Sequence, residues 1–273
     1  MTPIATAHLF PTLHQRLIAL LRSLDAREWE RPTVAPTWSV KDVAAHLLDT
    51  QQRQVSRLRG EPQPTPSIAS NADLVAYINR LNDAGVRRYR LLDAAQLIAL
   101  MEEGAALCNA HYAALDPLGD AVFGVSWAGE ERSPNWFHVA REFTERWHHQ
   151  QQIRLAVEKP GIMTRELYYP VLDCFMRALP FTYRDVVRPE GTVIRVTIAG
   201  ACGGAWHLER EAQTWRLADA PAGPATAVVD IPQEIAWRIF TKGLSRAEAE
   251  SQVGVSGDTS LARHALGAIA IVG

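Results

Sequence analysis

The segment NWFHVAREFTERWHHQQQIRLA, residues 135–156, decides how the rest of the chain is interpreted. It contains neither Pro nor Gly, while Pro134 suits the first turn of a helix and the Pro-Gly pair at 160–161 suits its termination. We therefore predict one long helix here. Within it, Glu145 and His149 are four residues apart, so an α-helix places both side chains on one face, one turn apart.

A carboxylate and an imidazole at this spacing have two interpretations. They can bind one metal ion, as the two histidines of the H-E-x-x-H motif do. More commonly such a pair is solvated and contributes about 0.2–0.5 kcal/mol to helix stability. The apolar side chains of Trp136, Phe143 and Trp147 lie on a different face of the same helix. Either the polar face is in water, or the helix is buried on both sides and has a polar pocket on one.

The composition of the chain excludes several classes of protein. With 273 residues, 47% hydrophobic and 21% charged, it is typical of a soluble globular protein. A net charge of −2 weighs against nucleic acid or an anionic membrane as a partner. Cys108, Cys174 and Cys202 form no CxxC pair, so we predict neither a disulfide framework nor a cysteine zinc site. Because no secretory signal and no long apolar run is present, we expect a cytoplasmic location.

The order of predicted elements divides the chain in two. Ser39, with Asp42 three residues later, predicts a capping box at the start of a helix. Residues 116–133 are predicted to form a long connection. Helical periodicity predicts helices over residues 5–24, 40–59, 72–92, 94–115 and 165–178. Four strands with alternating apolar and polar residues are expected within 192–231, and two short helices follow them. Over residues 260–273 we expect a last helix and an optional last strand.

We therefore predict an all-helical domain over residues 1–182 and a smaller α+β domain over 183–273, a two-domain α plus α/β fold. Long helices with a long crossover suit an antiparallel four-helix bundle, in which metal sites are built from facing helices. His46 is the natural third ligand, because it is an internal histidine on a second long helix.

Two motifs give the chain a family resemblance. WSVKDVAAHLL at 38–48, the much later ERWHHQQ at 145–151 and the C-terminal strands together resemble the mycothiol-dependent maleylpyruvate isomerase family. The likeness covers nearly the whole chain. It implies a DinB-like metal-binding four-helix bundle followed by a domain similar to sterol-carrier folds.

The resemblance also implies a site and a cofactor. His46, Glu145 and His149 would bind a divalent metal, usually zinc, and three such ligands leave the fourth position open, as in catalytic zinc sites. Mycothiol would supply the thiol. The family often has Val-Asp after its two adjacent histidines, whereas Gln150 follows His148-His149 here, and this departure leaves the reaction open. We pair Glu145 with His149, because His148 lies about 100° away around the helix.

Two further polar side chains are weaker candidates. Arg53 lies about two turns beyond His46 on the same side, where it could anchor a substrate carboxylate or simply extend along the surface. His138 could line the same pocket, although a solvated role is the more common one for such a histidine.

The leading hypothesis is a metal-dependent thiol transferase or isomerase that activates mycothiol for addition to a small electrophilic substrate. One alternative is a thiol-independent hydrolase or lyase that uses metal-bound water. Another is a non-catalytic protein that binds a lipid or small ligand. We expect a small-molecule substrate, no nucleic acid and no membrane as partners, and a monomer or a homodimer.

Overall fold

The computed structural model describes residues 2–64 and 66–271, whose contacts form two compact units. One, the bundle unit, consists of residues 6–116 and 145–162. The other, the sheet unit, consists of residues 2–5, 117–144 and 163–271. The predicted helical and sheet-containing parts are thus both present. The predicted boundary after residue 182 stays a prediction, since the units group residues by contact and not by chain order.

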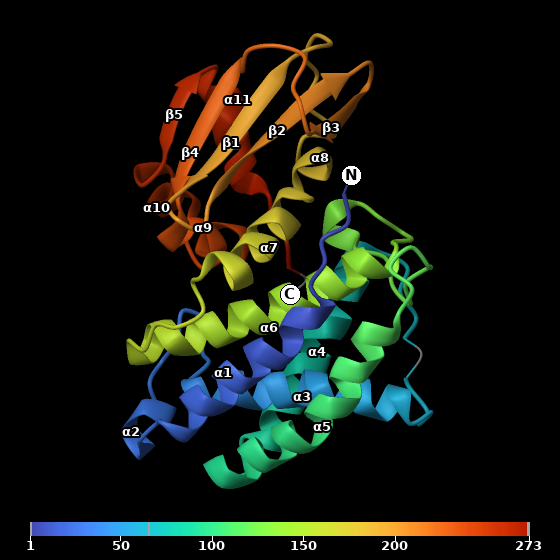
Figure 1. Cartoon of the computed structure of the whole chain (residues 1–273), viewed down its shortest axis with the longest axis vertical. Helices are drawn as coiled ribbons and strands as arrows, with labels where there is room; N and C mark the ends of the chain where they lie inside the picture. Colours follow the sequence, from blue (N-terminus) through green and yellow to red (C-terminus); the bar gives the residue numbers. More distant parts are fainter. Residues whose placement is uncertain (1, 65, 272–273) are drawn as a thin grey trace. The chain divides into compact units, whose positions relative to one another are not determined.

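Apart from an isolated β-bridge between Pro32 and Ser39, the regular elements of the described residues of the bundle unit are helices (Figure 1). Its helices are α1 (Phe10–Arg22), α2 (Ala26–Trp29), α3 (Val40–Leu58), α4 (Asn71–Tyr89), α5 (Ala94–Ala114) and the second half of α6 (Asn135–Val157). The ends of the long helices lie within five residues of those predicted, because most of them are marked by a capping or breaking residue. The four-residue helix α2 was not predicted, since it is too short to show a period.

One apolar core joins five of these helices, with Trp29 as the contribution of α2. Leucines of α1, the face of α3 that contains Val43 and Leu47, Met101 of α5 and Ile153 of α6 belong to one buried cluster. Each of these four helices contributes positions three or four residues apart, as expected of helices that each bury one stripe. This core fixes α3 and the second half of α6 against each other, and these are the two helices that carry the predicted ligands.

The start of α3 is fixed by its capping box. The backbone N–H of Asp42 donates to Ser39 Oγ at 3.3 Å, and Asp42 Oδ2 accepts from the backbone N–H of Ser39 at 3.0 Å. Two backbone donors that the helix leaves free are thereby satisfied. The predicted capping box is present, and it sets the rotation at which His46 leaves the second turn of α3.

We expect Ser39→Ala to lower the free energy of unfolding by about 1 kcal/mol, because one N-terminal amide of α3 loses its acceptor. Urea unfolding followed by circular dichroism measures the change. Ser56→Ala is the matched control, since Ser56 lies inside the same helix and alanine is the better helix former there. Equal losses in both variants would show that the cap contributes nothing specific.

The sheet unit contains five strands in the order β3-β2-β1-β4-β5. The strands are β1 (Val193–Ala199), β2 (Gly204–Glu211), β3 (Thr214–Ala218), β4 (Ala227–Pro232) and β5 (Gly254–Gly257). Besides the first half of α6, the α-helices of this unit are α7 (Arg165–Met176), α8 (Leu179–Thr182), α9 (Gln233–Phe240), α10 (Arg246–Ser251) and α11 (Thr259–His264). The central strand β1 pairs antiparallel with β2 and parallel with β4, so that Val196 lies opposite both Trp206 and Val229.

Four of the strands were predicted from alternating apolar and polar residues, and in β1 and β4 the burial of the side chains largely follows this alternation. The short edge strand β5 was missed, since Gly254 and Gly257 at its ends weaken any strand signal. Strand β5 precedes the closing helix α11, whereas the sequence analysis placed an optional last strand after this helix. Residues 272 and 273, at the end of that predicted strand, lie outside the described residues. Within the described part of the chain, no helix is both long and apolar enough to cross a bilayer.

Candidate metal centre

His46 is held inside the bundle unit by α3. Its side chain is only 5% exposed, and its Nδ1 is buried with no hydrogen-bond partner among the described residues. The Trp38 indole lies just before the capping box, with its ring centroid 5.0 Å from that of His46. A buried imidazole nitrogen without a partner costs free energy, which a ligand at that nitrogen would offset.

The polar face of α6 lies opposite its apolar stripe and is buried as well. His148, His149 and Gln152 are all buried, and only Glu145 keeps an appreciable exposure, 31% of its side chain. Of the two environments that the sequence allowed for this face, the structure has the second: the helix is buried on both sides. The spacing of three, four and seven residues from Glu145 brings all four side chains to one face.

Three ligand-type side chains of α6 converge at this face, and His46 of α3 packs against one of them. His149 Nε2 lies 3.6 Å from Glu145 Oε2, and His148 Nδ1 lies 4.0 Å from the same oxygen. One ligand atom from each of these three residues lies within 4.8 Å of the others. The His46 ring meets the His149 ring edge to face, with centroids 4.5 Å apart. Two segments separated by about a hundred residues of sequence thus place three imidazoles and a carboxylate together.

Burial keeps the three imidazoles neutral. Desolvation lowers the pKa of His149 from 6.5 to about 4, although its hydrogen bond with Gln152 acts in the opposite direction. Desolvation also lowers the pKa of His46 and of His148 well below the ordinary range, and for both the charge of a protonated His149 would lower it further. At neutral pH each ring therefore keeps an unprotonated nitrogen, which is the form that binds metal ions.

The donor set fits a divalent metal. Two ligand atoms held about 2.0–2.1 Å from a tetrahedral zinc ion are about 3.3 Å apart, close to the 3.6 Å between His149 Nε2 and Glu145 Oε2. Imidazole and carboxylate donors suit zinc, and the buried Nδ1 of His46 gives a third nitrogen in need of a partner. Of the three predicted residues, Glu145 and His149 lie within ligand distance of each other, and the His46 ring packs against that of His149. His148, which the sequence analysis left as a neighbour, belongs to the same cluster.

The other candidate residues lie in different surroundings. Arg53 of α3 places Nε 2.9 Å from Asp49 Oδ2 and donates through Nη2 to Asn82 Oδ1 of α4 at 3.3 Å. Its positive charge still helps to lower the pKa of His46, so it lies near the cluster. His138 is in the part of α6 that belongs to the sheet unit, where Arg141 Nη2 lies 3.0 Å from His138 Nδ1.

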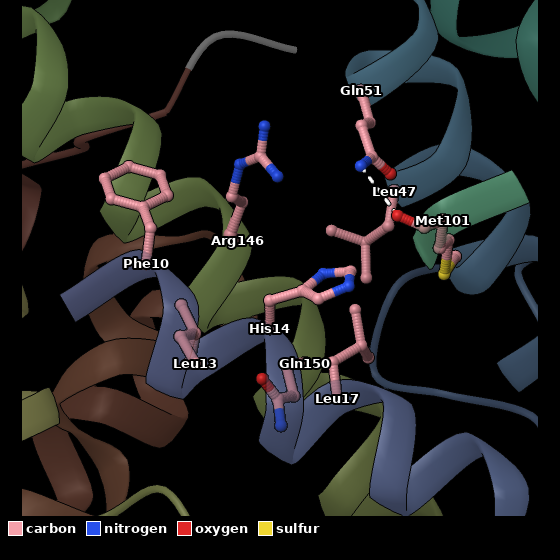
Figure 2. A pocket seen from close by; sticks show the side chains of 9 residues that line it. All are labelled: Phe10, Leu13, His14, Leu17, Leu47, Gln51, Met101, Arg146 and Gln150. Carbon is pink, nitrogen blue, oxygen red and sulfur yellow. Dashed lines mark hydrogen bonds between the residues drawn. The ribbon is translucent and has the colours of Figure 1, made fainter. Parts of the chain in front are cut away.

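The neighbouring face of α6 lines a small cavity within the bundle unit (Figure 2). Arg146 and Gln150 of α6, His14 of α1 and Gln51 of α3 supply its polar groups, and Gln51 Nε2 donates to the Met101 carbonyl at 2.8 Å. Its volume of about 20 Å³ accommodates one or two water molecules. This cavity is therefore too small for an organic substrate, and the histidine cluster is the stronger candidate site.

Two features of the cluster escaped the sequence analysis. Trp38 packs against His46, and its ring centroid lies 6.4 Å from that of His149, so that it forms an apolar wall beside both imidazoles. Gln152 lies within hydrogen-bonding distance of both histidines of α6. The signal for Gln152 was present, because residue 152 is seven residues beyond Glu145 and three beyond His149, on the face already identified.

Comparisons with known proteins agree with this architecture. The model of the mycothiol maleylpyruvate isomerase N-terminal domain matches residues 10–154, more than half of the chain. No curated protein gives a significant sequence match. A crystal structure of a mutant of the mycothiol-dependent maleylpyruvate isomerase has a TM-score of 0.51 at 13% identity, and a second crystal structure of that enzyme has 0.50 at 12%. Each alignment covers 94% of this chain and 96% of that enzyme.

At these identities the two crystal structures show a shared fold, whereas the family model matches the sequence itself. The matched residues include His46, Glu145, His148 and His149. The chain therefore belongs to the mycothiol maleylpyruvate isomerase family.

Proposed function

We propose that this protein is a metal-dependent enzyme of the maleylpyruvate isomerase type that activates a low-molecular-weight thiol, mycothiol, for addition to or isomerisation of a small electrophilic substrate. The observation that carries the proposal is the convergence of His46, Glu145 and His149, two neutral imidazoles and one carboxylate from two helices of one bundle. Family membership supports mycothiol as the thiol and this class of reaction.

His46, Glu145 and His149 would hold the metal, with zinc as the first choice. When bound there, zinc supplies Lewis-acid activation that lowers the pKa of a thiol toward neutrality. The Trp38 ring shields the imidazoles beside it from water. Glu145 is the one partly exposed member of the set, so a ligand from solution reaches the site on its side.

The thiol must come from a second molecule. Burial raises the pKa of Cys174 to about 12 and also raises that of Cys202, so neither is a thiolate at neutral pH. Both lie in the sheet unit, and Cys108 is buried in α5 outside the histidine cluster. A small diffusible thiol is therefore the nucleophile in this proposal.

Arg53 is the proposed anchor for a substrate carboxylate. Its guanidinium is oriented by Asp49 on the same helix and by Asn82 on α4, which leaves the charge in a defined position near His46. A guanidinium held in this way can bind a carboxylate through two parallel hydrogen bonds.

Turnover by zinc-loaded protein tests the proposal. In the presence of mycothiol, we expect the protein to consume maleylpyruvate, which is measured by the absorbance of maleylpyruvate. This consumption should require both zinc and thiol. Thiol recovered unchanged identifies an isomerase, and thiol consumed one-for-one identifies a transferase. The His46→Ala variant should be inactive, because it lacks one metal ligand.

Two results would contradict the proposal. Turnover that needs zinc but no thiol would favour the hydrolase or lyase alternative. Purified protein that binds no divalent metal under any loading condition would favour a non-catalytic binding protein.

A further inference from the structure

Gln152 contacts both histidines of α6 through the two ends of one amide. Its Oε1 lies 2.9 Å from His149 Nδ1, and its Nε2 lies 2.9 Å from His148 Nε2. All three side chains are buried, so water does not compete for these contacts. A carboxamide oxygen can only accept and its nitrogen can only donate, so one amide imposes opposite requirements on two rings.

These requirements determine where each neutral imidazole carries its proton. His149 must donate from Nδ1 to the amide oxygen, which leaves the lone pair on its Nε2, 3.6 Å from Glu145 Oε2. His148 must accept at Nε2 from the amide nitrogen, which places its proton on Nδ1, 4.0 Å from the same carboxylate oxygen. A neutral imidazole has one N–H and one lone pair, so no other assignment satisfies both contacts.

We propose that Gln152 is a positioning residue that selects His149, and not His148, as the metal ligand of α6. His149 presents a lone pair toward Glu145, whereas His148 presents an N–H there and has its own lone pair engaged by the amide. The cluster offers two adjacent histidines to one cation, and the single amide makes only one of them a ligand.

The position of His46 agrees with this selection. Its ring packs against the His149 ring, with centroids 4.5 Å apart, so His46 and Glu145 would hold a cation together with His149. A hydrogen bond from the remote N–H of a ligating histidine to an oxygen acceptor also fixes the ring and increases its basicity. Gln152 Oε1 makes this contact with His149 Nδ1. If the amide had the opposite orientation, both tautomers would be reversed and His148 would face Glu145 with its lone pair.

The tautomers can be measured without a metal. Long-range ¹H–¹⁵N spectra of the metal-free full chain, labelled at histidine and recorded at pH 7, distinguish a protonated from an unprotonated ring nitrogen. His148→Gln and His149→Gln variants assign the two rings. We expect both rings to be protonated at Nδ1. Protonation of His149 at Nε2, with an unprotonated Nδ1 on His148, would overturn the proposal.

Two substitutions of Gln152 separate positioning from packing. A glutamate at this position can accept from both rings but donate to neither, so in Gln152→Glu we expect His148 to change its tautomer while His149 keeps its own. In Gln152→Leu both constraints are lost, and we expect zinc affinity, measured by competition with a chromophoric chelator, to fall about 10–100-fold. Gln151→Leu is the matched control, since Gln151 is also buried and should leave both tautomers unchanged.

If Gln152→Leu does not fold, the Gln152→Glu spectrum decides alone, because unchanged tautomers in that variant would contradict the selection. The role of Gln152 in catalysis rests on the metal-dependent function proposed above, whereas the tautomers do not. Wild-type protein with the expected tautomers but no zinc binding would therefore contradict the proposed function and leave the selection by Gln152 standing.

Discussion

Replacing His149 by alanine is expected to lower zinc affinity by more than about a hundredfold. This loss is larger than the roughly 10–100-fold loss expected when a residue that only hydrogen-bonds to a metal ligand is removed. The variant loses the nitrogen that lies 3.6 Å from the Glu145 carboxylate. His46→Ala should have an effect of similar size, because it removes the second nitrogen of the set. Competition titration with a chromophoric chelator measures both affinities.

His148→Ala is the discriminating comparison. If Gln152 engages the His148 lone pair, removing His148 perturbs Gln152 but removes no ligand, so the loss should stay within about tenfold. His8→Ala, at an exposed histidine outside the cluster, should leave the affinity unchanged. The opposite pattern, a large loss in His148→Ala and a small one in His46→Ala, would assign the site to Glu145, His148 and His149.

Acidification from pH 7 to pH 5 is expected to destabilise the metal-free protein strongly. The pKa of His149 is about 4 in the folded state, against 6.5 for an ordinary histidine. Between these values the unfolded chain binds a proton that the folded chain does not, so the free energy of unfolding falls as pH falls. His149 alone contributes a loss of about 2 kcal/mol over this interval, at ~1.4 kcal/mol per pH unit below 6.5.

His46 and His148 act in the same direction, because burial lowers their pKa values as well. Stability should therefore be complete above about pH 7 and decline progressively toward pH 4. Urea unfolding at a series of pH values, with chelator present, measures the slope. A His149→Asn variant should show a smaller slope between pH 6 and pH 5, whereas His8→Ala should reproduce that of the wild type. An unchanged slope in His149→Asn would mean that this imidazole is not buried in neutral form.

The match between sequence and structure is closest where one local rule decides the outcome. The helix around Glu145 and His149 follows from an uninterrupted run between Pro134 and the Pro-Gly pair at 160–161. The start of α3 follows from the capping box at Ser39. The strand β5 did not follow from any local rule, because four residues that begin and end with glycine pair with β4 only when the sheet is assembled.

For the candidate ligands, too, the sequence predicted the local placement and the tertiary structure decided the surroundings. Spacing alone placed Glu145 and His149 on one helical face. The position of His46 inside a second long helix of the predicted bundle made it the third candidate, and the resemblance implied the same residue. No property of the sequence alone determined that this face is buried or that Trp38 lies beside it. His148 was left out of the predicted ligands although its spacing of three residues from Glu145 puts it on the same face.

The sequence by itself determined the long helices, four of the five described strands and the side of α6 on which the polar residues lie, because these depend on neighbours within about one turn. Only the tertiary structure decided the surroundings of those residues. Burial of His46 and His149 lowers their pKa values, and the buried amide of Gln152 contacts two rings at once. Both effects arise from the low dielectric of a packed interior, which exists only after α3 and α6 have come together.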